Sequence, residues 1–252
     1  MKYYFLISYL PEIHRDDKKL RLRVSDLLAE KVHFAEKDWA QIELVLLAGD
    51  VLQVERLLSG KELGIDYQLF GREFWKEQIK SPKEVPEVFA GILDALLLEG
   101  PSPKNLNLLF EAYYAYAAQS ASGPFLPAYF RFEKDLRNIM AAIRARRKGL
   151  SPSDDLVGDG EIIDSLSRST AEDFGLGPEY PWIERLIAAK EPVETQEAIE
   201  QIMWETLEEM TEPMDFDFDV ILAYLLKLQL LERNLALSEE QGMEVVRQLE
   251  EL

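Results

Sequence analysis

The sequence predicts an all-α protein, a multi-helix bundle, and three observations lead to that prediction. Apolar residues recur at steps of three and four along most of the chain, which is the spacing of one buried helix face. Glycine and proline stand at the ends of these stretches, where helices begin and end. The sequence also offers no convincing pair of alternating strands joined by a hairpin turn.

The strongest helix prediction is residues 124–148, which lie between a Gly123-Pro124 break and Gly149. We expect its apolar stripe to pack against other helices. Its last turn carries four cations, which favour the negative end of a helix. The stripe consists of Leu126, Tyr129, Phe130, Leu136, Ile139, Met140 and Ile143, and the cations are Arg144, Arg146, Arg147 and Lys148.

The first sixty residues predict a buried N-terminal segment followed by three helices. The aromatic run 3–10 fits a strand or a buried helical turn, and we expect a buried segment because no partner strand is evident. Residues 24–31 predict a short helix. Residues 35–48, ended by Gly49, and residues 50–58, ended by Gly60, predict a helical hairpin with a minimal loop.

Two serines mark the expected starts of the next helices, after a helix that begins at Arg72. Ser81-Pro82-Lys83-Glu84 has the spacing of a capping box with proline at the first helical position, and its helix should end near Leu98, before Gly100. Ser102-Pro103 predicts another helix that runs to about Ser120.

Residues 150–160 predict a loop, because serine, proline, aspartate and glycine are concentrated there. Helices are then expected near residues 161–166, 182–189, 195–210 and 218–235. A second capping box, Ser238-Glu239-Glu240-Gln241, predicts the start of a separate C-terminal helix that reaches Leu252.

The charge distribution divides the chain at the same loop. Residues 1–150 carry 22 Lys+Arg and 21 Asp+Glu, whereas residues 151–252 carry 6 and 26, so the formal net charge of −19 lies almost wholly in the second part. We therefore predict a near-neutral N-terminal helical subdomain, 1–150, and an acidic C-terminal helical subdomain, 151–252, packed on it, or one continuous domain. The acidic part disfavours nucleic acid and anionic lipid, and fits either a basic protein partner or a solvated surface.

Residues suited to catalysis or metal binding are scarce. The chain has no cysteine and two histidines, His14 and His33, neither of which has a nucleophile or ligand motif nearby. The glycines of 157–160 and 175–178 lack the GK[ST] sequence of a phosphate loop. We expect no enzymatic activity, no catalytic residue, no cofactor and no metal site.

The segment MDFDFD, residues 214–219, resembles the start of a calcium loop. The glycine and glutamate that such a loop requires are replaced by Val220 and Leu226. The aspartates therefore favour the start of the next helix, with Phe216 and Phe218 buried.

The basic cluster Arg144, Arg146, Arg147 and Lys148 has two interpretations. It is a possible partner surface or anion site, and it is also what a helix C-terminus favours. The acidic run 194–212 is likewise a solvated face or a partner surface. No segment has the roughly 20 apolar residues of a membrane helix, and the apolar start, which ends at Pro11 without a small-residue cleavage site, predicts no signal peptide.

Three stretches together resemble a known family. They are YYFLISYLP (3–11), FEKDLRNIMAAIRARRKG (132–149) with LVGDGEI (156–162), and FDFDVILAYLLKLQLLERNLALSEEQG (216–242). They resemble an uncharacterised bacterial family encoded with V-type ATPase subunits. That family is similar to the C-type subunit of V/A-type ATP synthases, whose counterpart in vacuolar enzymes is the d-type subunit.

This resemblance implies pseudo-repeated helical bundles around a funnel, although the chain is shorter than a usual C-type subunit. It implies a non-catalytic central-stalk coupling subunit of a bacterial V-type ATPase, which links the rotor shaft to the membrane ring during proton or sodium transport. The expected partners are therefore rotor-shaft and membrane-ring subunits, without nucleic acid, membrane insertion or small-molecule substrate. The expected place is cytoplasmic, peripheral to the inner membrane through the ATPase complex.

Two alternatives remain open from the sequence. One is an assembly factor or peripheral regulator of the same ATPase, which would bind transiently. The other, from a different class, is a helical hydrolase with an acidic metal site, for which the sequence offers no ligand pattern.

Overall fold

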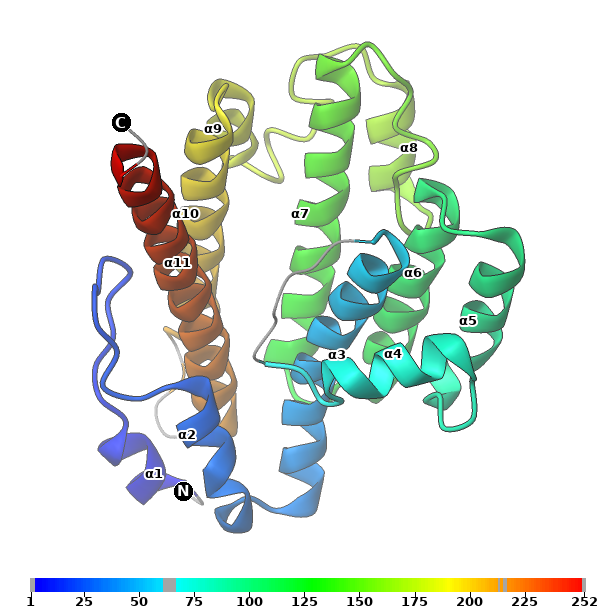
Figure 1. Cartoon of the computed structure of the whole chain (residues 1–252). Coiled ribbons are helices and arrows are strands. Elements are labelled where there is room, and N and C mark those ends of the chain that lie inside the picture. The colour runs from blue at the N-terminus through cyan, green and yellow to red at the C-terminus, as the bar shows by residue number, and fades with distance from the viewer. Residues whose placement is uncertain (1–2, 61–66, 213, 215–216, 251–252) are drawn as a thin grey trace. The chain divides into compact units, whose positions relative to one another are not determined.

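The computed structural model describes residues 3–60, 67–212, 214 and 217–250, with side chains up to residue 237, and every regular element in these ranges is a helix (Figure 1). This confirms the all-α, multi-helix prediction. Within the described ranges, none of the helices combines the length and the apolar content needed to cross a membrane.

The helices group into two compact units, which are described separately. Unit 1 comprises residues 1–39 and 200–252, and unit 2 comprises residues 40–199. The helices α3 (Glu36–Leu58) and α10 (Pro192–Thr211) each contribute residues to both units. The boundary expected at residue 150 lies inside unit 2.

Unit 1 contains α1 (Tyr4–Tyr9), α2 (Val24–Ala29), the 3-10 helix η1 (Glu30–His33) and α11 (Phe218–Glu250). Its aromatic cluster is centred on Tyr3, whose ring lies 5.5 Å from the rings of Phe34 and Phe218. The Tyr3 hydroxyl donates to Asp38. Two long-range bonds join the start of the chain to α11: Tyr224 Oη donates to the Pro11 carbonyl at 2.9 Å, and the Val24 amide donates to Glu232 Oε1 at 2.7 Å.

Two predictions for unit 1 are wrong. The segment 3–10 is not buried as a whole, because Tyr3 is buried whereas Phe5 and Tyr9 are 88% and 84% exposed. Those two residues are four apart and therefore share the outer face of a short helix. The capping box at Ser238 does not start a new helix, because α11 continues through that position to Glu250.

Unit 2 is built around α7 (Phe125–Arg147), which contacts α6 (Pro103–Ser120), α8 (Glu161–Arg168) and α9 (Ile183–Ala188). The predicted stripe is confirmed: Leu126, Leu136 and Ile139 are buried, as are its other members except the half-buried Met140. Burying each large apolar side chain contributes roughly 1.5–3 kcal/mol. Unit 2 also contains α4 (Arg72–Lys80) and α5 (Glu87–Glu99).

The predicted hairpin at Gly49 is wrong, because α3 is one continuous helix through this residue. A tertiary contact explains the glycine instead, because a Cβ atom at position 49 would lie 2.3 Å from the carbonyl oxygen of Tyr67. Gly49 therefore lets the chain near Tyr67 approach the helix backbone closely.

The capping box predicted at Ser81 is also wrong, because α5 begins at Glu87. The Gln78 side-chain oxygen accepts hydrogen bonds from the amides of Lys83 (2.9 Å) and Glu84 (2.8 Å), which holds this segment as a turn. The prediction at Ser102 is confirmed, because its hydroxyl caps α6 by accepting from the Asn105 amide at 3.1 Å.

Candidate functional site

The four cations at the end of α7 divide into two pairs. Arg146 and Arg147 hydrogen-bond to backbone carbonyls of other segments, whereas Arg144 and Lys148 line a pocket. Both pairs belong to unit 2. The sequence placed all four in a single candidate partner surface, and the structure gives them different surroundings.

Arg147 fixes the end of α9. Its Nη2 donates to the carbonyls of Leu186 (2.8 Å), Ile187 (3.3 Å) and Ala189 (2.6 Å). The last carbonyls of a helix have no partner inside the helix, and a cation is favoured there by the helix dipole. Arg147 therefore serves as a capping group for a second helix.

Arg146 fixes the loop between α8 and α9 in the same way. Its two Nη atoms donate to the carbonyls of Ser169 (2.8 Å), Ala171 (2.6 Å) and Glu172 (3.0 Å). Its guanidinium also lies 3.6 Å from the centre of the Phe174 ring, which adds a cation–π contact. The side chains of Arg146 and Arg147 are therefore already bonded to the backbone of other segments.

Arg144 and Lys148 line a pocket of about 610 Å³ together with Arg137. The three cations are spaced i, i+7 and i+11, with Lys148 directly after the last residue of α7 and in helical conformation, so they form one stripe along the helix. We call this the basic pocket. Its remaining walls come from the end of α3, the start of α6 and the loop after α7, and its lining includes Glu55, Leu58, Asn107, Leu150 and Asp155.

Arg137 is held in this pocket by two contacts. Its guanidinium lies 3.3 Å from the centre of the Phe110 ring, and its Nη2 donates to Asn107 Oδ1 at 3.3 Å. Its Nε is buried without a hydrogen-bond partner in the described part of the chain. Burial lowers the pKa of Arg137, while the nearby Tyr114 and Glu55 act in the opposite direction; an arginine nonetheless keeps its charge.

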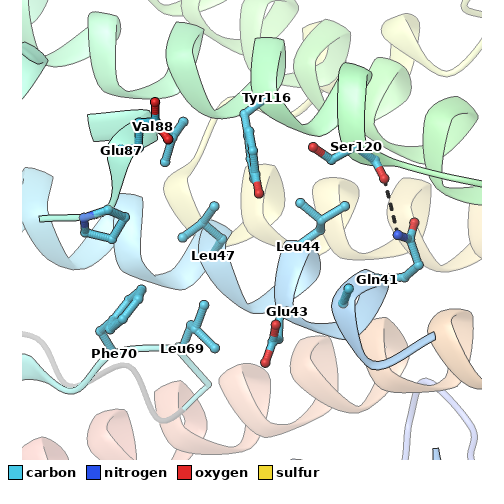
Figure 2. Close-up of a pocket in the computed structure, with 12 residues that line it drawn as sticks. Gln41, Glu43, Leu44, Leu47, Leu69, Phe70, Glu87, Val88, Tyr116 and Ser120 are labelled. Atoms are coloured by element: carbon cyan, nitrogen blue, oxygen red, sulfur yellow. Dashed lines mark hydrogen bonds between the residues drawn. The ribbon is translucent and has the colours of Figure 1, made fainter. Parts of the chain in front are cut away.

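Unit 2 has a second pocket of about 340 Å³, which Figure 2 shows with its lining residues. Its walls are mainly apolar, and Glu43 and Glu87 are the charged residues that line it. Gln41 closes one end by donating to the Ser120 carbonyl at 3.2 Å, the dashed line in Figure 2. The apolar lining consists of Ala40, Leu44, Leu47, Leu69, Phe70, Pro86, Val88 and Tyr116.

Asp50 supports one wall of this second pocket. Its carboxylate accepts hydrogen bonds from the amides of Leu69 (2.7 Å) and Phe70 (3.0 Å) and from Trp75 Nε1 (2.6 Å). Asp50 is fully buried, and this burial raises its pKa to about 6 against the three hydrogen bonds, which lower it. No role for Asp50 was predicted from its residue type, and its position directly after Gly49 was the available signal.

The other polar residues singled out from the sequence contact nearby residues of the chain. His14 and His33 are exposed, and they lie beside the carboxylates of Glu12 at 3.8 Å and Glu30 at 3.3 Å. In the 173–177 turn, Asp173 accepts from the amides of Gly175 and Gly177, which orders the glycines without a ligand.

The MDFDFD motif is described in part. Phe218 is half-buried against Tyr3, whereas Asp215 and Phe216 lie outside the described residues. Over the described ranges, no three His, Asp or Glu side chains come together in a way that could hold a metal ion.

The fold and the basic pocket define a class: an all-helical protein with a charged cavity lined by cations of one long helix. The chain belongs to a family described as "Protein of unknown function (DUF2764)", whose sequence profile matches residues 1–252. A relative described as "Uncharacterized protein" from Chlamydia muridarum (strain MoPn / Nigg) is 24% identical, over 99% of this chain and 97% of the relative. No solved structure matches.

Proposed function

We propose that the chain is a non-catalytic coupling subunit of a bacterial V-type ATPase, which links the rotor shaft to the membrane ring at the central stalk. The observation that carries this proposal is the resemblance of residues 132–149 and 156–162 to the family encoded with that ATPase. These two stretches are neighbours in the structure. Asn138 of the first donates to the Val157 carbonyl (3.0 Å) and accepts from the Val157 amide (2.8 Å).

The mechanical properties of unit 2 support the same proposal. Torque transmission needs elements that do not bend, and α3 and α7 each run for 23 residues without a break. At 1.5 Å per residue each is roughly 34 Å long. Asn138 and Val157 are both buried, so α7 is joined to the loop that follows it by a pair of hydrogen bonds inside the core.

The charge of the chain suggests how the partners would be recognised. Residues 151–252 carry 26 Asp+Glu against 6 Lys+Arg, and such a surface attracts a basic protein surface and speeds its encounter. In this proposal the acidic part contacts the shaft or ring subunits, and the chain is held at the cytoplasmic face of the membrane through them.

Purification of the V-type ATPase from the source bacterium tests the proposal. A tag on a different subunit would be used, and the chain would be quantified by mass spectrometry. We expect one copy per rotor shaft, retained with both the shaft and the membrane ring. An intact, active complex without this chain would overturn the proposal. A chain present only in incomplete complexes would instead favour an assembly factor or peripheral regulator.

A charge-reversal pair tests the acidic surface within that experiment. Glu209 and Glu212 are exposed near the end of α10, and Glu84 and Glu111 are exposed in unit 2. Glu209→Lys with Glu212→Lys should reduce the recovered copies, whereas Glu84→Lys with Glu111→Lys, which changes the net charge equally, should not. Equal recovery of both variants would mean that the acidic end of α10 serves solvation alone.

A further inference from the structure

The basic pocket has features of a binding site that are independent of any role in an ATPase. Arg137, Arg144 and Lys148 lie on one stripe of α7 and line a cavity of about 610 Å³. Ligand pockets in proteins commonly have volumes of this order. Eleven residues of helix separate the outermost two cations, which is roughly 16 Å at 1.5 Å per residue.

Most donors of these three cations have no acceptor among the described residues. Within the described ranges, Arg144 makes one side-chain bond, from Nε to the Met140 carbonyl of its own helix at 3.2 Å. Neither Arg144 nor Lys148 forms an ion pair with any residue in the described part of the chain. Arg137 Nε is buried there without an acceptor. By contrast, Arg146 and Arg147 on the same helical turn donate to six backbone carbonyls.

The rest of the lining restricts what the cations can bind. Glu55 and Asp155 also face this cavity, so its charged residues sum to one positive charge. The whole chain carries −19. A long polyanion such as nucleic acid would be repelled by Glu55 and Asp155 and by the net negative charge of the chain. A compact ligand can place its anionic groups on the stripe and its apolar part against Leu58, Leu106 and Leu150.

We propose that the basic pocket binds a small organic phosphate, with phosphoryl oxygens on Arg137, Arg144 and Lys148 and the organic part against the leucines. Arginine suits this chemistry because its planar fork gives two parallel hydrogen bonds to a phosphate, and lysine adds a point charge. Arg137 is held in place for this contact by the Phe110 ring beneath it and by Asn107.

Calorimetric titration of the full chain with three probes tests the proposal. The affinity for inorganic phosphate reports the binding of one phosphoryl group. The affinity for tripolyphosphate reports contact with the whole stripe, and that for phenyl phosphate reports contact with the apolar wall. We expect tripolyphosphate to bind about tenfold more tightly than phosphate, since additional charge-assisted bonds form. We also expect phenyl phosphate to bind more tightly than phosphate. The absence of binding by all three probes would overturn the proposal.

A matched pair of variants locates the site. Arg144→Gln with Lys148→Gln should weaken tripolyphosphate binding at least about tenfold, since two charged donors are lost. Lys104→Gln with Arg131→Gln removes two exposed cations that do not line the pocket, and should leave affinity within about twofold. Equal weakening in both variants would mean non-specific attraction and would overturn the proposal. Circular dichroism and melting temperature confirm that each variant is folded.

Sedimentation with vesicles distinguishes a lipid headgroup from a soluble organic phosphate as the ligand. Phosphatidylcholine vesicles that contain phosphatidic acid present a phosphate monoester at a surface, and pure phosphatidylcholine vesicles, whose headgroup is a phosphodiester, are the control. We expect the chain to remain in the supernatant with both. Sedimentation that requires phosphatidic acid, and that Arg144→Gln with Lys148→Gln abolishes, would overturn the assignment to a soluble ligand in favour of a lipid headgroup. Neither result depends on the presence of the chain in an ATPase, so this proposal can fail alone.

Discussion

Two sets of polar side chains in unit 2 differ in what they do for the fold. Asp50, Asn138 and Arg147 each bond to the backbone of a segment far away in the sequence and hold that segment in place. Arg144 and Lys148 line the basic pocket and bond to no other segment in the part of the chain that the structure describes. The comparison separates charges and amides that the fold needs from those available to a ligand, and it predicts a graded series of effects on stability.

The largest effect is expected at Asn138, which is fully buried. Asn138→Ala removes both bonds to Val157 and leaves the buried amide and carbonyl of Val157 without partners. The free energy of unfolding should therefore fall by about 2–4 kcal/mol. Urea unfolding measures the change. Asn107→Ala is the control, because its bonds to the Asp154 carbonyl and to Arg137 Nη2 are exposed or only partly buried, and it should cost less than about 1 kcal/mol. Similar losses in the two variants would contradict the role of Asn138 as a buried anchor.

Asp50 should come next, and its effect should depend on pH. Asp50→Asn replaces one acceptor oxygen by a donor that cannot bond to an amide N–H, which costs about 1–3 kcal/mol. Burial raises the pKa of Asp50 from 3.8 to about 6. The folded chain therefore binds this proton more tightly than the unfolded chain, and the resulting stability is lost as pH rises through about 6.

The measurement is the difference in unfolding free energy between wild type and Asp50→Asn at two pH values. Other carboxylates titrate in both proteins and cancel in this difference. The wild-type advantage should be larger at about pH 5 than at about pH 7.5, by about 1 kcal/mol. An advantage that grows with pH would mean that the three hydrogen bonds outweigh burial, so that the carboxylate is the favoured form.

Arg147→Ala should have a smaller effect, because its side chain is exposed at the protein surface. Loss of three bonds to the end of α9 should cost about 1–2 kcal/mol, since water can replace part of each bond. Thermal unfolding and hydrogen exchange near Ala189 measure it. Arg147→Lys keeps the charge but not the planar fork, and should recover less than half of the loss. Full recovery by lysine would show that charge alone matters.

The sequence predicted the helices of this fold well because their signals are local. The stripe from Leu126 to Ile143, the cap at Ser102 and the stop at Gly149 each depend on residues within one or two turns. The three wrong boundaries had a different cause. Glycine is needed at position 49 because the backbone of Tyr67 approaches closely, and the segment after Ser81 is bonded to Gln78. The helix that contains Ser238 continues through that residue.

The candidate site could be predicted only in part. Arg144, Arg146, Arg147 and Lys148 are equivalent in the sequence, since all four lie at a helix end. The carbonyls that bind Arg146 and Arg147 lie 23 to 42 residues away, so nothing local distinguishes those two. Arg137 was not predicted, because the pocket that it lines requires four segments to meet.

The smallest effect on stability is expected at the basic pocket. Arg144→Ala with Lys148→Ala should change the unfolding free energy by no more than about 0.5 kcal/mol, because neither side chain bonds to another of the described segments. Arg146→Ala with Arg147→Ala removes the same charge from the same helical turn, and should cost several times more because six carbonyl contacts are lost. Thermal unfolding of the two double variants side by side measures the contrast. Equal losses would show that all four cations stabilise the fold alike, and the division into loop-fixing and pocket-lining pairs would fail.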